Sequence, residues 1–269
     1  MTSTLRVLQT YRAVTSRLTA SDIADPLPIV HPNETFEHVF ESEFWREIAL
    51  VRDETNIYGY IDLTDPPENP DTSAGMIAKP IPADQIVPAE TPLLDLVQLF
   101  PQHFFFFLLT RNELVGLVSY IYVDRHPVKL CLFALMLELE ATISQRLTGD
   151  RYISKANYYL SLLRPARIEK AKELARQKGL KGGPFDLLEC TTLIDKTKMI
   201  LNSELAPTLK TVSGEESAEG FLSRVEKVRN EIAHGGSVLK FLPKPTDLVA
   251  FTEQLQRMIS ILGSESDDL

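Results

Sequence analysis

The spacing of hydrophobic residues changes near residue 128, which divides the chain into two parts of different architecture. Before that point, short apolar runs alternate with turn residues, as they do in strands. They predict two β-hairpins, with strands at residues 47–52, 57–63, 104–110 and 114–120. A helical segment with a proline-containing start precedes each hairpin. Gly59 and Gly116 hold equivalent places, 57 residues apart (116 − 59), so the first part contains an internal repeat of a small α/β module.

Two segments of this first part differ from the alternating pattern. Residues 64–81 are rich in proline, aspartate and glycine, which predicts an exposed connection between the copies that is too polar to pack. The run of four phenylalanines and two leucines at 104–109 lacks alternation, which predicts a strand that is buried on both faces.

After Pro127 the hydrophobic period becomes helical. We predict helices at 128–147, 151–163, 165–179, 185–203, 216–234 and 246–262. The expected fold class is multidomain, an α/β part followed by an all-α bundle. The expected divisions are an N-terminal helical segment (1–20), a tandem α/β domain (21–128), a helical bundle (129–263) and a disordered tail (264–269).

The charge and cysteine content limit the partners and the compartment. The 269 residues carry a net charge of −9, but residues 1–128 hold −10 and residues 129–269 hold +1. Polyanion binding needs clustered Lys and Arg, so an RNA partner is expected to contact the second part. Cys131 and Cys190 form no CxxC motif, and no secretory signal or membrane-spanning apolar stretch is present. We therefore expect a cytoplasmic protein without a membrane partner.

The repeated module resembles a pair of CBS domains, in which each copy runs strand, helix, two strands, helix. The resemblance covers roughly residues 21–128 and rests on the repeat, on the hairpins and on the glycine that enters each last strand, Gly59 or Gly116. In this family the last strand ends in a glycine, a hydroxyl residue and an aspartate that binds the ribose of adenosine nucleotides.

Each copy carries part of the nucleotide motif that the resemblance implies. The first copy has Asp62 where the hydroxyl is expected, and Asp62 would repel a phosphate. The second copy has Tyr122 in the aspartate slot. Two interpretations stay open: a degenerate pair kept for dimerisation, or a sensor of AMP or ATP. The residues expected to bind such a nucleotide are Gly59, Asp62, Asp65, Ser119 and Asp124.

A second resemblance is carried by residues 229–234, which read Arg-Asn-Glu-Ile-Ala-His directly before Gly235 and Gly236. They match the R-x4-H motif of HEPN domains, including the polar residue after the arginine. HEPN domains are all-α bundles, and many are metal-independent ribonucleases that act as dimers, with two motifs meeting in one cleft. The resemblance places Glu140 at an acidic position in the first helix of the bundle.

The residue types of this motif suit RNA cleavage by the 2′-hydroxyl. Asn230 and His234 are one helical turn apart, and Arg229 lies about 140° round the helix from His234. Histidine exchanges protons near neutral pH, and such proton transfer accelerates reactions about 10²–10⁴-fold. The arginine fork holds two phosphate oxygens and keeps its charge. We expect Arg229, Asn230 and His234, with Glu140, to form a catalytic site that requires no metal or cofactor.

A basic stretch and a tyrosine group are further features of the second part. Residues 164–181 hold seven Lys and Arg against two Glu, which is typical either of an RNA-binding track or of a solvated helix face. Tyr152, Tyr158 and Tyr159 precede it and are expected either to stack on bases or to pack in the core.

The sequence predicts a homodimeric endoribonuclease regulated through its α/β part, of the toxin or defence type. The alternative is a non-catalytic dimeric regulator that senses adenine nucleotides or binds RNA. A third class, the partner of a nucleotidyltransferase, lacks a separate transferase signature in this chain.

Overall fold

The computed structural model describes residues 12–42, 47–149, 152–204, 206–212 and 216–264. The chain forms two compact units, an α/β unit (Leu18–Arg125) and a helical unit that joins the residues up to Arg17 with those from His126 onward. The mixed α/β and helical content agrees with the expected fold class. Most of the expected tail, and residues 1–11 of the expected N-terminal segment, lie outside the described residues.

The unit boundaries differ slightly from the expected ones. The change of unit at Arg125 and His126 lies three residues before the predicted division at 128/129, because the long first helix of the bundle begins at His126. The N-terminal segment was expected to be separate, but residues 18–20 belong to the α/β unit and residues 12–17 to the helical unit. There, Arg12 Nε donates to a Glu138 carboxylate oxygen at 3.1 Å.

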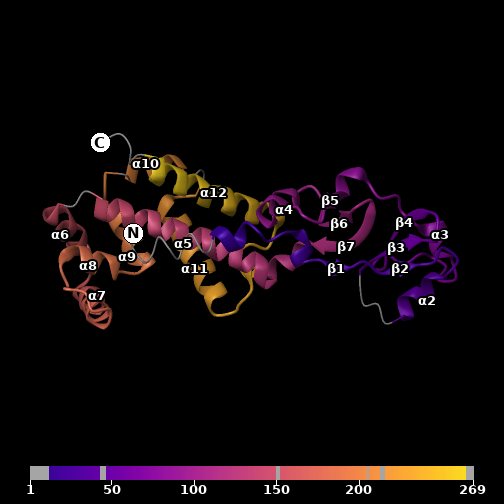
Figure 1. Ribbon diagram of the computed structural model, residues 1–269, viewed down its shortest axis with the longest axis horizontal. Coiled ribbons are helices and arrows are strands. Elements are labelled where there is room, and N and C mark those ends of the chain that lie inside the picture. Colours follow the sequence, from indigo (N-terminus) through magenta and orange to yellow (C-terminus); the bar gives the residue numbers. More distant parts are fainter. Residues whose placement is uncertain (1–11, 43–46, 150–151, 205, 213–215, 265–269) are drawn as a thin grey trace. The chain divides into compact units, whose positions relative to one another are not determined.

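The α/β unit consists of two copies of one β-α-β-β arrangement (Figure 1). In each copy a short strand pairs in parallel with the first strand of the hairpin, and the hairpin is antiparallel. The first copy comprises β2 (Ile29–Val30), α2 (Phe36–Glu41), β3 (Ile48–Arg52) and β4 (Ile57–Asp62). The second comprises β5 (Ile86–Pro88), α4 (Leu93–Leu99), β6 (Phe105–Thr110) and β7 (Glu113–Ser119), with β1 (Asp25–Pro26) beside β7.

The predicted repeat is confirmed at the level of strand register. Leu50 pairs with Ile29 in the first copy, and Phe107 pairs with Ile86 in the second, each residue 57 positions after its counterpart. The irregularity in each hairpin also recurs, between Val51 and Arg52 and between Leu108 and Leu109. A bulge adds an unpaired residue and is a specific feature of a strand, so its repetition shows that both copies share one local structure.

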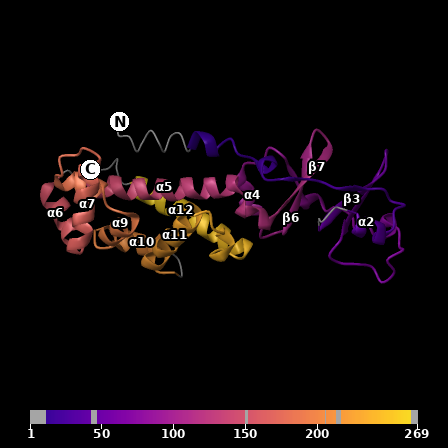
Figure 2. The same ribbon diagram turned by 90° about the horizontal axis from the view of Figure 1, so that it is seen from below.

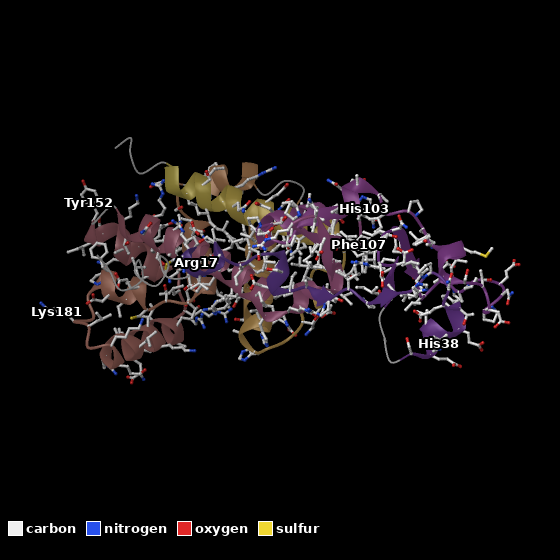
Figure 3. All side chains as sticks on the ribbon, turned by 45° about the vertical axis from the view of Figure 1, so that its right-hand side comes forward. Arg17, His38, His103, Phe107, Tyr152 and Lys181 are labelled. Atoms are coloured by element: carbon white, nitrogen blue, oxygen red, sulfur yellow. The ribbon has the colours of Figure 1, made fainter. Side chains whose placement is uncertain are left out.

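The two copies pack through a shared apolar core. Leu50 and Phe107, which are equivalent in the two copies, lie in one cluster, and Tyr60 of β4 contacts the Phe107 ring with centroids 5.5 Å apart. On the other face of β6, Phe106 contacts Phe100, with centroids 5.8 Å apart. The prediction that this strand is buried on both faces is therefore confirmed for Phe106, Phe107 and Leu108, whereas Phe104 is 50% exposed. Figure 3 labels Phe107 among the packed side chains.

The prediction that residues 64–81 form only an exposed connection is wrong. Within this segment, α3 (Ala74–Ile77) packs on the first copy, and Ala74 is fully buried. The backbone explains the packing: Phe36 N donates to Thr72 O at 2.9 Å, and Ala74 N donates to Glu34 O at 2.8 Å. A few apolar residues, together with these satisfied backbone groups, suffice to dock a segment that is polar on average.

The helical unit is built around α5 (His126–Gly149), and α12 (Pro245–Ser264) runs alongside it (Figures 1 and 2). The helices between them are α6 (Ile153–Ser161), α7 (Pro165–Gln177), α8 (Pro184–Glu189), α9 (Leu193–Ile200), α10 (Ala206–Val212) and α11 (Ala218–Ala233). The predicted apolar face of the last helix is buried, with Leu248, Phe251 and Leu255 fully enclosed. No helix among the described residues has the length and apolar character needed to cross a membrane.

One predicted helix, 185–203, is divided into α8 and α9. The division follows from capping: Thr192 N and Oγ1 both donate to the Asp195 carboxylate, at 3.1 and 2.9 Å, and so start a new helix. The helix period alone did not predict this break because no glycine or proline marks it.

Candidate functional site

The predicted R-x4-H motif lies at the end of α11, which is terminated by glycine geometry. His234 is the C-cap residue, and Gly235 adopts φ +77°, which L side chains rarely occupy. Gly236 N donates to Glu231 O at 2.8 Å and Gly235 N to Ile232 O at 3.0 Å, the two bonds of a Schellman motif. The motif's histidine is therefore held at a helix end, and its side chain is exposed.

Arg229 lies one and a half turns before His234, partly buried against α5. Its NH2 group is 3.8 Å from the Glu140 carboxylate, and its NH1 group donates to Asn230 Oδ1 at 3.5 Å. Its guanidinium carbon is 5.9 Å from the centre of the Phe133 ring. The Nε atom is buried and has no hydrogen-bond partner among the described residues. Arg229 is thus held by long contacts and keeps one third of its side chain exposed.

A lysine forms an ion pair with the Glu140 carboxylate oxygen that does not face Arg229. Lys196, on α9, donates to Glu140 Oε1 at 3.0 Å, and the two side chains are only 7% and 18% exposed. Buried ionised groups need such pairing, because each charge loses its hydration. Glu140, on α5, therefore contacts both α9 and α11. Its ion pair with Lys196 is short, at 3.0 Å, and its contact with Arg229 is long, at 3.8 Å.

A second ion pair lies beside the first. Arg167, on α7, binds the buried Asp195 through two hydrogen bonds, from Nε at 2.8 Å and from NH2 at 2.9 Å. Burial alone would raise the pKa of Asp195. The hydrogen bonds from Arg167 and Thr192 outweigh that effect, and the pKa lies below its usual value. This bidentate pair leaves Arg167 much more firmly held than Arg229.

Glu226 links the two ion pairs along α11. It lies one turn before Asn230, whose amide hydrogen-bonds to it, and the charges of Arg167 and Arg229 act on it. Burial raises the pKa of Glu226, and these partners only partly oppose the effect. We call the six residues the charge cluster: Glu140, Arg167, Asp195, Lys196, Glu226 and Arg229.

The structure brings Glu140, Arg229 and Asn230 together but leaves His234 outside their contacts. Among the residues described, the imidazole of His234 makes no hydrogen bond or ion pair. One chain therefore presents a loosely bound guanidinium and a separate exposed imidazole on the same helix. An arginine can bind a phosphate with its fork, and a histidine can transfer a proton, so the helix end carries the groups needed for phosphate-ester chemistry.

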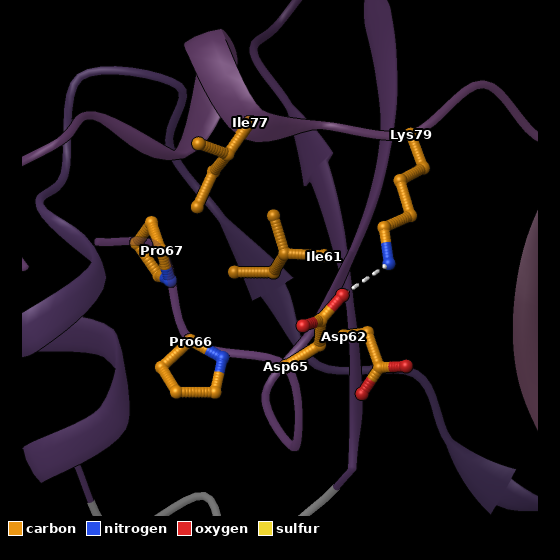
Figure 4. A pocket seen from close by; sticks show the side chains of 7 residues that line it. All are labelled: Ile61, Asp62, Asp65, Pro66, Pro67, Ile77 and Lys79. Atoms are coloured by element: carbon orange, nitrogen blue, oxygen red, sulfur yellow. Dashed lines mark hydrogen bonds and ion pairs between the residues drawn. The ribbon is translucent and has the colours of Figure 1, made fainter. Parts of the chain in front are cut away.

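The α/β unit holds a pocket that contains two of the predicted nucleotide residues (Figure 4). Its volume is about 250 Å³, and it is lined by Ile61, Asp62, Asp65, Pro66, Pro67, Ile77 and Lys79. Lys79 Nζ is 3.0 Å from Asp65 Oδ2, a contact that raises the pKa of Lys79. Asp62 Oδ1 accepts hydrogen bonds from Thr64 N at 2.9 Å and from Thr64 Oγ1 at 2.6 Å. Lys79 supplies a cation that the sequence motif did not predict.

In the second copy, Tyr122 stands where the first copy has Asp65, and it contacts other side chains of the α/β unit. Tyr122, 57 residues after Asp65, donates its hydroxyl to Asp25 Oδ2 at 2.7 Å. Arg125 pairs with the same carboxylate at 2.9 Å and covers the Tyr122 ring at 3.8 Å. Ser119 is buried, and its Oγ has no partner among the described residues. Asp124 ends the 3-10 helix η3 (Tyr120–Asp124).

The two motif glycines admit a neighbouring backbone. A Cβ atom on Gly59 would lie 2.1 Å from Lys79 O, and one on Gly116 would lie 3.0 Å from Asp25 O. The distance at Gly59 is too short for a side chain, and φ is also +138°, so this position requires glycine, whereas at Gly116 a Cβ atom would be a tight contact.

Sequence reasoning did not connect Lys79, Asp195, Lys196 and Glu226 with these sites, and it placed Arg167 only in the basic stretch 164–181. One signal was present for Glu226, because Glu226, Asn230 and His234 are spaced by four and share a helix face. The other four become neighbours of the sites only through tertiary contacts.

No group of three or more His, Cys, Asp or Glu residues that could hold a metal ion occurs in the described parts of the chain. No family model, curated protein or solved structure matches this chain.

Proposed function

We propose that this chain is a metal-independent endoribonuclease of the HEPN type, acting as a cytoplasmic homodimer under the control of a CBS-like nucleotide-binding pair. A toxin or defence effector is the role that such an activity would serve. The helical unit would carry the catalytic site, with Arg229, Asn230 and His234 in the cleft and Glu140 behind Arg229.

The observation that carries the proposal is that only long contacts hold the Arg229 guanidinium within the chain. Arg167, in the same cluster, is fixed by two short bonds to Asp195, whereas Arg229 contacts its carboxylate only at 3.8 Å and leaves Nε unpaired. A guanidinium with this little internal bonding can turn to a phosphate at small cost. His234, on the same helix end, is exposed and can reach a substrate.

The reaction follows from these groups. One His234 accepts the proton of the ribose 2′-hydroxyl, and the 2′-oxygen forms a bond to phosphorus. The bond from phosphorus to the 5′-oxygen breaks, and the leaving oxygen takes a proton from the protonated His234 of the second copy. Arg229 stabilises the negative charge on the phosphorane oxygens. The products are a 2′,3′-cyclic phosphate and a 5′-hydroxyl, so no water or metal takes part in this step.

The dimer supplies what a single chain lacks. General base and general acid must act on opposite sides of the phosphorus, and the helical unit contributes one described histidine near Arg229. Two α11 ends facing each other would provide two imidazoles and two guanidinium groups.

Cleavage of RNA in EDTA tests the proposal. We expect wild type to cleave total tRNA or a mixed single-stranded RNA and to leave 2′,3′-cyclic phosphate ends. His234→Ala should lower the rate at least about 100-fold, because it removes proton transfer. The matched control is His38→Ala, which removes an exposed imidazole from the α/β unit and should cleave like wild type.

Retention of cleavage by His234→Ala, or cleavage that disappears in EDTA and returns with added metal, would contradict this mechanism. Absence of cleavage by wild type, with and without AMP or ATP and with dimers intact, would favour the non-catalytic regulator.

A nucleotide-sensing role has its own supporting observation, the pocket around Asp62, Asp65 and Lys79. Asp65 can accept bonds from ribose hydroxyls, and Lys79 offsets the repulsion between Asp62 and a phosphate. Because the second copy has Tyr122 in place of the aspartate, and Tyr122 and Arg125 both bind Asp25, we expect one AMP or ATP per chain.

Titration calorimetry with AMP and ATP measures this stoichiometry. Lys79→Ala should weaken binding at least about tenfold, since a hydrogen bond to a charged group contributes about 1.5–3 kcal/mol. Lys227→Ala, in the helical unit, is the control and should bind like wild type. Two sites per chain, or unchanged affinity in Lys79→Ala, would refute this assignment.

A further inference from the structure

The cationic residues in α7 and at its two caps differ in their partners. Lys172 and Arg176 are paired with glutamates on the same helix, Lys172 with Glu169 at 2.7 Å and Arg176 with Glu173 at 2.8 Å. By contrast, Arg164, Lys170 and Lys178 have no ion pair in the described parts of the chain, and all three are exposed. We call these three residues the α7 stripe.

The α7 stripe is distributed along the length of the helix. Arg164 is the N-cap residue of α7, Lys170 lies within the helix and Lys178 is its C-cap residue, so the three cations are six and eight residues apart. Arg167, which lies between Arg164 and Lys170 in sequence, reaches the charge cluster through Asp195. The helix that carries the unpaired cations is therefore joined to the cluster that contains Arg229.

An exposed aromatic residue lies near the start of the stripe. α6 and α7 contact α9 in sequence: Tyr158 OH donates to Asn202 O, Lys198 Nζ donates to Leu162 O, and Arg167 binds Asp195. The seven residues from Asp195 to Asn202 span about 10 Å of helix. Tyr158 is 50% exposed, whereas Tyr159 is buried. Tyr152 is also exposed and lies at the same end of the unit as Lys181 (Figure 3).

We infer that the α7 stripe and Tyr158 form the substrate-binding surface of the helical unit, and that its ligand is single-stranded RNA. This inference rests on the proposed function and names its substrate class. Unpaired cations spaced along one helix attract the phosphates of a strand, because their binding releases counterions. An exposed tyrosine beside them stacks on an unpaired base, which a duplex does not offer. Arg167, which binds Asp195, connects α7 to the charge cluster that contains Arg229.

Fluorescence anisotropy of a labelled single-stranded 12-mer RNA tests the inference, with His234→Ala as the parent so that the RNA stays intact. The stripe variant adds Arg164→Ala, Lys170→Ala and Lys178→Ala to this parent. Its matched control adds Lys172→Ala and Arg176→Ala. For single strands the slope of log affinity against log salt is about −0.7 per phosphate contact. The stripe variant should lose about two units of slope, and the control should keep the parental slope.

A second arm tests the aromatic contact. Tyr158→Ala should weaken binding of the single strand about tenfold, within the range of about 1–3 kcal/mol for stacking of one base, and should change duplex binding less. Tyr158→Phe keeps the ring and should bind like the parent. Melting temperatures measured by circular dichroism establish that each variant is folded.

Equal loss of slope in the stripe variant and its control, or parental affinity in the stripe variant, overturns the inference; the latter would fit an acidic protein partner instead. These outcomes do not depend on cleavage. If wild type cleaves RNA and the stripe variant keeps the parental slope, the ribonuclease stands and the surface is refuted. If wild type does not cleave but the stripe variant alone loses slope, the surface stands without the activity.

Discussion

Arg229→Lys is expected to lower kcat/KM for RNA cleavage about 100- to 1000-fold. The variant keeps the positive charge, so the loss measures the planar fork that holds two phosphorane oxygens at once. The magnitude is that found when one preorganised donor to a developing oxyanion is removed. The wild-type guanidinium has long contacts to Glu140 and Asn230, so the substitution breaks no short internal bond.

The matched control is Arg257→Lys on α12. Arg257 also lies 3.8 Å from a carboxylate, that of Glu253, but it is 69% exposed and remote from α11 in sequence. Both variants should melt within a few degrees of wild type, and Arg257→Lys should cleave at the wild-type rate. If the loss in Arg229→Lys is confined to KM, the fork binds the ground state and does not stabilise the transition state. Full activity in Arg229→Lys would refute a catalytic role for this side chain.

Lys196→Met is expected to lower the free energy of unfolding of the helical unit by about 3 kcal/mol, the lower end of the range for removing one partner of a buried ion pair. The substitution leaves Glu140 charged, with 18% of its side chain exposed, and with Arg229 as its remaining cation at 3.8 Å. Urea unfolding followed at 222 nm measures the effect, because most of the helical signal comes from this unit.

Removing both Lys196 and Glu140 should cost less stability than removing Lys196 alone. Lys196→Met combined with Glu140→Leu removes both charges and should recover much of the lost stability, since apolar residues often replace a buried ion pair without cost. Lys172→Met breaks the exposed pair with Glu169 and should cost within about 1 kcal/mol. A single Lys196→Met variant as stable as wild type would show that the Glu140 charge is solvated and that the pair is not part of the core.

Much of the fold could be read from local pattern. Alternation and helical spacing between near neighbours in sequence indicate which side of an element is buried. They were enough to predict the hairpins, the 57-residue repeat, the buried β6 and the apolar face of α12. Two errors have the same origin. α3 docks through hydrogen bonds to residues about 40 positions earlier, and the break between α8 and α9 comes from a side-chain cap rather than from a breaker residue.

The sequence by itself determined which residues share a helix end or a strand end: Arg229, Asn230 and His234 at the end of α11, and Asp62 and Asp65 at the end of β4. The tertiary structure alone decided how strongly each is held. Lys196 reaches Glu140 across 56 residues, Arg167 reaches Asp195 across 28, and Tyr122 reaches Asp25 across 97. Spacing along the chain specifies which residues share one face of a helix or strand. Which charged groups compete for one carboxylate depends on which helices pack together, and this packing follows from burial of the whole core.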